Sequence, residues 1–173
     1  MRKYRNKIFF IIAAFIVLAS FLYAASAGRV KMNPAEIIFD DGDSFGYHGV
    51  NIRLLGIDTP EIIHKEHGIY ENQHLGLEAA EFTRKAFSEA KDVFYEPFTK
   101  DRYGRTLAHV IIDGELLAVK LIEAGLAYET ISQYGDNGFK EYGDKILNAW
   151  NKVPRPTFTN PFYWRKKHQK KRE

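Results

Sequence analysis

The chain has 173 residues, of which 45% are hydrophobic and 27% are charged, and its formal net charge is +3. This length allows one domain with a buried core and short appendages. Cysteine is absent, which excludes a disulfide framework, a thiolate metal site and a thiol nucleophile.

The positive charge is concentrated at the two ends of the chain. Residues 1–7 include four basic residues, and residues 165–173 include six basic residues and one acidic residue. Between them, residues 28–164 carry 15 basic and 21 acidic residues, a net charge of −6. A protein that binds nucleic acid through a broad basic face has the opposite balance. Phosphate recognition by this chain must therefore be local, with a few arginines and a bound cation.

The N-terminus has the pattern of an export signal. Basic residues occupy positions 1–7, residues 8–27 are uncharged and almost wholly apolar, and the run ends in Ala25-Ser26-Ala27. This order predicts a signal peptide over residues 1–27. The apolar run of residues 8–27 is also long enough to be retained as a membrane anchor. We therefore expect a secreted or membrane-anchored protein whose globular part lies outside the cytoplasm.

Two strands joined by an acidic turn are predicted after this segment. Residues 35–39 and 45–55 have strand-like composition, and the aspartate- and glycine-rich residues 40–43 between them favour a turn. Inside the second strand, Tyr47-His48-Gly49 predicts a tight hairpin. The predicted strand region ends at Asp58-Thr59-Pro60, where Pro60 keeps Thr59 out of helical geometry.

The rest of the chain alternates helices and strands. The predicted helices cover residues 73–90, 116–124 and 139–151, the predicted strands cover residues 93–98 and 106–112, and residues 62–72 form a polar loop. Three prolines after residue 153 predict an extended tail, which its aromatic residues pin to the body. This order of elements indicates a small α+β fold built around a β-barrel.

Three short motifs place carboxylates and arginines along the predicted strands. They are Asp41-Gly42-Asp43-Ser44, Arg53-Leu54-Leu55-Gly56-Ile57-Asp58-Thr59-Pro60-Glu61 and Asp101-Arg102-Tyr103-Gly104-Arg105. Clustered carboxylates supply the oxygen ligands that hard divalent cations need, and arginine binds phosphate with a planar fork of donors. Each motif alone is compatible with a solvated turn or an exposed strand face. Together they indicate a metal-assisted site that acts on a phosphodiester.

In order and spacing, these motifs closely resemble the staphylococcal nuclease (thermonuclease) family, and the resemblance runs from about residue 36 to residue 150. It implies an OB-fold over residues 28–153, a five-stranded β-barrel with about three α-helices. The signal or anchor helix of residues 1–27 would precede this domain, and a tail rich in proline, aromatic and basic residues, 154–173, would follow it. The implied activity is calcium-dependent, sugar-nonspecific cleavage of DNA and RNA that leaves 3′-phosphate ends. The substrate would be single-stranded or melted duplex, and the protein would be a monomer.

The resemblance also assigns roles to individual residues. Asp43, Asp58 and the backbone carbonyl of Thr59 would hold the calcium ion, with water and a phosphate oxygen completing its shell. Arg53 and Arg105 would clamp the scissile phosphate and stabilise the charge of the transition state.

Glu61 would be the general base of the reaction, although a carboxylate at this position could instead only orient the attacking water. Arg102 and Tyr103 match the segment that contacts the terminal phosphate and base of the substrate. Tyr134 matches a later aromatic residue that stacks on a base.

Two other functional classes stay open. A non-catalytic OB-fold module would bind nucleic acid or protein at the cell surface without cutting it, and a structural surface domain would share only the fold. The presence of Arg53, Glu61 and Arg105 together favours the enzyme, because a binding module has no need of all three.

Two further clusters carry weaker signals. His64, His67 and His74 could chelate zinc, but a solvated loop is the favoured interpretation. The basic run of residues 165–172 could contact nucleic acid or an anionic surface, and a solvated chain end is slightly favoured over both.

Overall fold

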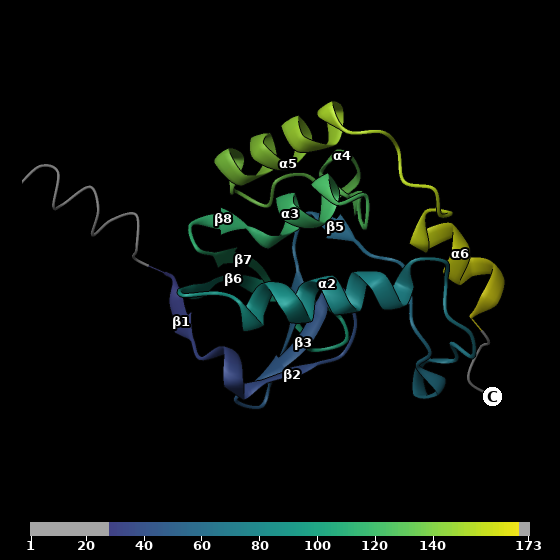
Figure 1. The fold of residues 1–173 in the computed structure, drawn as a ribbon, viewed down its shortest axis with the longest axis horizontal. Helices are drawn as coiled ribbons and strands as arrows, with labels where there is room; N and C mark the ends of the chain where they lie inside the picture. The colour runs from purple at the N-terminus through teal and green to yellow at the C-terminus, as the bar shows by residue number, and fades with distance from the viewer. Residues whose placement is uncertain (1–27, 170–173) are drawn as a thin grey trace, which may run out of the picture.

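The computed structural model describes residues 28–169 (Figure 1). The predicted signal or anchor segment, residues 1–27, lies outside this range, as do residues 170–173. Within residues 28–169, no helix is long and apolar enough to cross a membrane.

The main sheet has seven strands in the order β1-β6-β7-β4-β3-β2, with β8 paired to β7. The strands are β1 (Val30–Met32), β2 (Ile37–Phe39), β3 (Ser44–Tyr47), β4 (Val50–Leu54), β6 (Val93–Lys100), β7 (Thr106–Ile112) and β8 (Glu115–Leu116). Neighbouring strands are antiparallel except for β4 and β7, which run parallel. A separate antiparallel pair consists of β5 (Ile57–Asp58) and β9 (Tyr128–Glu129).

Helices cover the curled sheet and close the ends of its strands (Figure 1). The described residues form the α-helices α2 (Gly76–Ser88), α3 (Leu117–Glu123), α4 (Ile131–Tyr134), α5 (Lys140–Lys152) and α6 (Pro161–His168), and the 3-10 helices η1 (Pro34–Glu36) and η2 (Lys65–His67). Helix α2 is amphipathic, and its buried residues recur every three to four positions as Gly76, Ala79, Ala80, Thr83 and Phe87. This spacing lets one face of α2 pack on the protein while the other stays in solvent.

The predicted hairpin at Tyr47 is confirmed. Tyr47 and Val50 are paired across β3 and β4, so His48 and Gly49 form a two-residue loop. Both have positive φ, 48° and 77°. A type I′ turn requires this conformation at both central residues, and its twist matches that of the flanking strands.

One hydrophobic cluster lies between the sheet and the helices. Its most deeply buried large side chains include Phe45, Ile52, Phe87, Leu121 and Ile146. These residues come from β3, β4, α2, α3 and α5, so the core joins the strands that carry the acidic turn to every long helix. Burial of this apolar surface, at about 25 cal/mol per Å², holds the site-bearing turns in place.

The predicted α+β class is confirmed, but several details differ. The main sheet has seven strands where five were predicted, because the short strands β1 and β8 extend it beside β6 and β7. The described residues form five α-helices where about three were predicted, and the additional ones are the short helices α4 and α6. Periodicity cannot identify such short segments.

The predicted extended tail is wrong for its second half, which forms α6. The Asn160 side chain accepts a hydrogen bond from the Phe162 N–H at 3.0 Å, and Pro161 occupies the first helical position. Both features favour a helix start. The prediction that aromatic residues pin the tail is confirmed for Phe158 and Trp164, which are buried.

Candidate active site

Arg53 projects from the middle of the sheet. It lies on β4 between the buried residues Ile52 and Leu54, so its side chain points to the opposite face from theirs. The register places Arg53 opposite Ser44 of β3 and beside Leu107 of β7. Arg105 precedes β7 by one residue and is two residues before Leu107, so it lies on the same face of the neighbouring strand. The predicted pair of arginines therefore shares one face of the sheet.

The turn that precedes β3 is fixed by its own carboxylate and by α2. Asp41 Oδ1 accepts hydrogen bonds from the backbone N–H groups of Asp43 and Ser44, at 2.9 and 2.7 Å. The Thr83 hydroxyl of α2 donates to the Gly42 carbonyl at 2.6 Å. A Cβ on Gly42 would lie 2.8 Å from Oγ1 of Thr59, so only glycine allows this approach. The turn is therefore held against both α2 and the segment after β5.

Asp58 reaches the site through a turn that also requires glycine. Gly56 has a φ of +82°, and a Cβ there would lie 2.5 Å from Cδ1 of Ile146 in α5. The Gly56 carbonyl accepts a hydrogen bond from the Thr130 N–H at 2.9 Å. After this turn, Asp58 pairs with Tyr128 of β9. The core contact with α5 thus determines where the second carboxylate lies.

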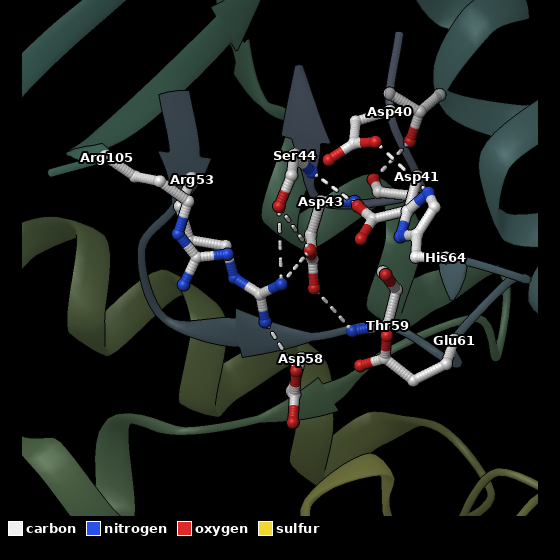
Figure 2. Close-up of polar contacts among 12 residues, drawn as sticks. Asp40, Asp41, Asp43, Ser44, Arg53, Asp58, Thr59, Glu61, His64 and Arg105 are labelled. Carbon is white, nitrogen blue, oxygen red and sulfur yellow. Dashed lines mark hydrogen bonds and ion pairs between the residues drawn. The ribbon is translucent and has the colours of Figure 1, made fainter. Parts of the chain in front are cut away.

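Arg53 bridges the two aspartates that the sequence assigned to metal binding (Figure 2). Its Nη1 donates to Oδ1 of Asp43 and its Nη2 to Oδ1 of Asp58. The other Asp43 oxygen, Oδ2, accepts the Thr59 backbone N–H at 2.7 Å. The three predicted metal-binding residues are therefore brought together. The side-chain donors of Asp43 and Asp58 are hard oxygens, the donor type that hard divalent cations prefer.

The carboxylates of this site are almost completely buried. Asp43 is 0% exposed, and Asp58 and Glu61 are each 6% exposed. Burial raises the pKa of the Asp43 carboxyl to about 8 against the opposing effect of Arg53, and Asp41 and Asp58 add to the rise. Burial lowers the pKa of Arg53, but the Asp43 and Asp58 charges outweigh this and raise it overall. Burial is thus the main reason why the charged form of Asp43 is disfavoured, and further positive charge beside this carboxylate would favour that form.

Arg165 of α6 also enters this site, which was not predicted. Its Nη2 donates to Asp58 Oδ2 at 2.8 Å and its Nη1 to Asp58 Oδ1 at 3.1 Å, while Nη1 also donates to Glu61 Oε1. Burial raises the pKa of Glu61, and the Arg165 charge opposes that rise. The favoured interpretation of residues 165–172 as a solvated end is therefore wrong for Arg165.

Among the described residues, no hydrogen bond or ion pair joins the predicted substrate-binding residues Arg102, Tyr103 and Tyr134 to the site carboxylates, and the first two share a turn with the catalytic candidate Arg105. Arg105 is held by Asp101, whose Oδ2 accepts from Arg105 Nε at 2.9 Å and from Nη2 at 2.8 Å. In the same turn the Arg102 guanidinium lies 4.7 Å from the ring centre of Tyr103, which is 69% exposed. Tyr134 ends α4 and is 62% exposed. Among the described residues, no hydrogen bond or ring contact links it to this turn.

His64 and His67 lie with their ring centres 6.0 Å apart, but the three histidines considered for zinc do not form a metal-ligand group within residues 28–169. His64 Nε2 pairs instead with Asp40 at 3.1 Å. One ligand atom each of Asp40, Asp41 and His64 lie within 4.8 Å of one another, the single such group among residues 28–169 (Figure 2). This group borders the turn that carries Asp43, and its hydrogen bonds order that turn.

With this geometry established, comparison with known proteins identifies the family. The sequence profile described as Staphylococcal nuclease homologue matches residues 51–153. The chain belongs to the staphylococcal nuclease family. It is 30% identical over 162 residues to a thermonuclease of Staphylococcus intermedius, a match that covers 82% of this chain and 95% of that protein. A thermonuclease of Staphylococcus hyicus is 33% identical over 141 residues, covering 73% of this chain and 81% of that protein.

A similar relative is an uncharacterized protein of Methanocaldococcus jannaschii, 33% identical over 131 residues, with 63% of this chain and 61% of that protein covered. The nuclease-family match includes Arg53, Asp58, Glu61 and Arg105 but ends before α6. Asp43 and Arg165 both lie outside the residues that the family profile matches.

Proposed function

We propose that this protein is a calcium-dependent, sugar-nonspecific nuclease that hydrolyses phosphodiester bonds of DNA and RNA outside the cytoplasm. The observation that carries the proposal is the convergence of the buried Asp43 and Asp58 carboxylates on Arg53, on the sheet face that Arg105 shares. Membership of a family that includes thermonucleases supports the same chemistry. In this proposal the curled sheet corresponds to the OB-fold barrel of the family.

Asp43, Asp58 and the Thr59 carbonyl would hold the calcium ion, which when bound supplies positive charge to a phosphate oxygen. The donor set fits, because its atoms are hard oxygens of residues that are buried together beside Arg53. Arg53 bridges the two aspartates, so its guanidinium lies next to the place where a phosphate beside the ion would bind.

Arg53 and Arg105 clamp the scissile phosphate with fixed positive charge. This charge interacts more strongly with the five-coordinate transition state than with the ground state, and the barrier is lowered. Glu61 accepts a proton from a water molecule whose oxygen bonds to phosphorus. The bond from phosphorus to the 5′ oxygen breaks, which leaves a 3′-phosphate and, after protonation, a 5′-hydroxyl.

Arg102, Tyr103 and Tyr134 bind the substrate on either side of this centre. Arg102 contacts phosphate, and the exposed tyrosine rings stack on bases. Because a stacked base in a duplex cannot offer its face to a tyrosine, the substrate is single-stranded or melted. The protein acts as a monomer, and residues 1–27 direct it out of the cytoplasm as a signal or an anchor.

The test is cleavage of single-stranded DNA and RNA by the purified protein, with calcium and with excess chelator. We expect cleavage only with calcium, products with 3′-phosphate ends, and loss of cleavage in Asp43→Asn. Undiminished cleavage in chelator would overturn the metal assignment. Tight binding without cleavage in saturating calcium would instead show a non-catalytic binding module.

A further inference from the structure

Helix α6 places a guanidinium on two carboxylates that the proposed reaction needs. Arg165 donates to both oxygens of Asp58, at 3.1 and 2.8 Å, and to Oε1 of Glu61. Asp58 is assigned to the ion and Glu61 to the attacking water. Arg165 therefore contacts a metal ligand and the base of the reaction with one planar group.

While Arg165 is in place, Asp58 and Glu61 are not free to bind a cation and a water molecule. With Arg53 on Oδ1 and Arg165 on both oxygens, the Asp58 carboxylate has no oxygen without a guanidinium partner. A cation that binds Asp58 must displace a positive charge that already lies there. Oε1 of Glu61 is likewise occupied by the Arg165 guanidinium, at the place where a water molecule would have to donate.

The rest of the C-terminal segment is built to present Arg165 at this place. The Tyr128 hydroxyl donates to the Phe158 carbonyl at 3.0 Å, and the Gln73 side-chain amide donates to the Thr159 carbonyl. Phe158 and Trp164 are buried, so apolar contacts anchor the segment on both sides of the helix start.

The far end of α6 is anchored as well. His168, stacked on Trp164 with ring centres 4.5 Å apart, pairs with Glu71, and Gln169 donates to the His67 carbonyl at 2.7 Å. Both partners belong to the loop between β5 and α2, beside which α6 lies in Figure 1. The helix is thus docked at both ends on the segment that follows Glu61.

We propose that the C-terminal segment, residues 154–169, is a built-in inhibitor that competes with the divalent cation, with Arg165 standing in for the ion. The inference rests on the proposed calcium site and adds a regulatory state to it. In the closed state Arg165 neutralises Asp58 and Glu61, and in the open state the ion takes its place.

The closed state can open because the docking of α6 depends partly on the ion pairs of Arg165 with Asp58 and Glu61. A helix of eight residues is not stable alone and requires its tertiary contacts. Cation binding removes the partners of Arg165 and so favours release of the helix. By thermodynamic linkage, release of the helix must strengthen cation binding by the same factor.

Calcium binding by isothermal titration calorimetry, on the purified full chain, tests this linkage. We expect Arg165→Gln to bind calcium about 10-fold to 100-fold more tightly than wild type, since a closed fraction reduces the apparent affinity in proportion. Lys167→Gln is the matched control, because it removes the same charge two residues along, from the exposed side of α6. Its affinity should stay near that of wild type.

A second variant separates the docked helix from the charge alone. Trp164→Ala keeps Arg165 but removes the buried anchor of α6, and it should also tighten calcium binding. Limited trypsin digestion gives an independent readout, because α6 contains cleavage sites at Arg165, Lys166 and Lys167. Calcium should accelerate cleavage there in wild type and leave it unchanged in Asp43→Asn.

The outcomes distinguish this inference from the proposed function. Equal calcium affinities of wild type and Arg165→Gln would overturn the inhibitor and leave the calcium site standing. Tighter calcium binding in Arg165→Gln but not in Trp164→Ala would show that Arg165 acts only through its charge. It would overturn the role of the docked helix. No calcium binding in any variant would overturn the metal site and the inhibitor with it.

Discussion

The two positive groups that hold Asp58 reach it in different ways. Arg53 comes from β4, five residues away in the chain, and its direction follows from strand register. Arg165 comes from α6, 107 residues away, and its position depends on a few contacts of a short helix. The first belongs to the framework that makes the site, and the second to a segment that can leave it.

This difference separates the residues whose positions follow from the main fold from Arg165, whose position depends on the docking of α6. The turns that carry Asp43 and Asp58 pack closely at Gly42 and Gly56, and Thr83 of α2 donates a hydrogen bond to the first of them, so these contacts do not involve α6. The family match of residues 51–153 includes most of this framework but not α6. Substitutions at four positions of the framework test how it forms and stabilises the site.

The largest effect is expected at Arg105. Arg105→Lys keeps the charge but loses the planar fork that binds two phosphate oxygens, so kcat should fall by about 10² to 10³. The free energy of unfolding should change by less than about 0.5 kcal/mol, because the side chain is one-third exposed. Arg84→Lys, at an exposed arginine of α2, is the control for cleavage assays. Similar rates in both variants would remove Arg105 from the clamp.

The next effect concerns the turn that positions Asp58. Gly56→Ala adds a Cβ at positive φ and against Ile146, so the free energy of unfolding should fall by about 2 to 4 kcal/mol. Gly114→Ala has a φ of +87° and open space around its Cβ, and should cost only about 1 to 2 kcal/mol. Urea unfolding of both variants measures the difference. Equal costs would show that the contact with α5 does not constrain the turn.

A smaller effect is expected where α2 holds the acidic turn. Thr83→Val replaces the hydroxyl that donates to Gly42 and leaves a buried carbonyl without that partner, at a cost of about 1 to 3 kcal/mol. Thr83→Ser keeps the hydroxyl and should lose less than about 1 kcal/mol. Calcium affinity should fall in the valine variant only. If serine and valine behave alike, the hydrogen bond is not what fixes the turn.

The smallest effect is expected for the pH dependence of folding stability that comes from His64, in the loop that contacts α6. The hydrogen bond and charge of Asp40 raise the pKa of His64 to about 9, with Asp41 and Glu66 acting in the same direction. A raised pKa means that His64 stabilises the fold fully below about pH 6.5, and that this contribution is lost as the pH rises towards 9. Because Asp40 is half exposed, the contribution is under about 1 kcal/mol.

His64→Gln should therefore narrow the stability difference between pH 6 and pH 9.5, as measured by thermal unfolding. Wild-type pH dependence in this variant would assign the effect to other groups.

The framework was largely predictable from the sequence. Alternation of Ile52, Arg53 and Leu54 predicted the direction of the arginine, and the hairpin at Tyr47 followed from its turn residues. The pair of β5 and β9 was missed because two residues are too few to show a period. Roles of the individual site residues rest on the family resemblance, since spacing alone is compatible with solvated turns.

Arg165 could not be predicted in the same way. It lies in a run of basic residues whose composition is that of a solvated chain end. The Asn160-Pro161 pair is a helix-start signal that the sequence contains, but it indicates only where α6 begins. Arg165 is placed by the contacts that dock α6 and by carboxylates more than 100 residues away, and no local pattern encodes such partners.

The buried ring of Phe158 determines where the chain can be truncated without exposing hydrophobic surface. It packs edge-on against Tyr128, with ring centres 5.3 Å apart, and Tyr128 in turn lies 5.4 Å from Trp150 of α5. A truncated protein that ends at residue 153, where the family match ends, would lack Phe158. Its Tyr128 and Trp150 side chains would then form an exposed hydrophobic patch. Aggregation of such a truncated protein would result from the exposed patch and would not indicate that the full-length protein aggregates.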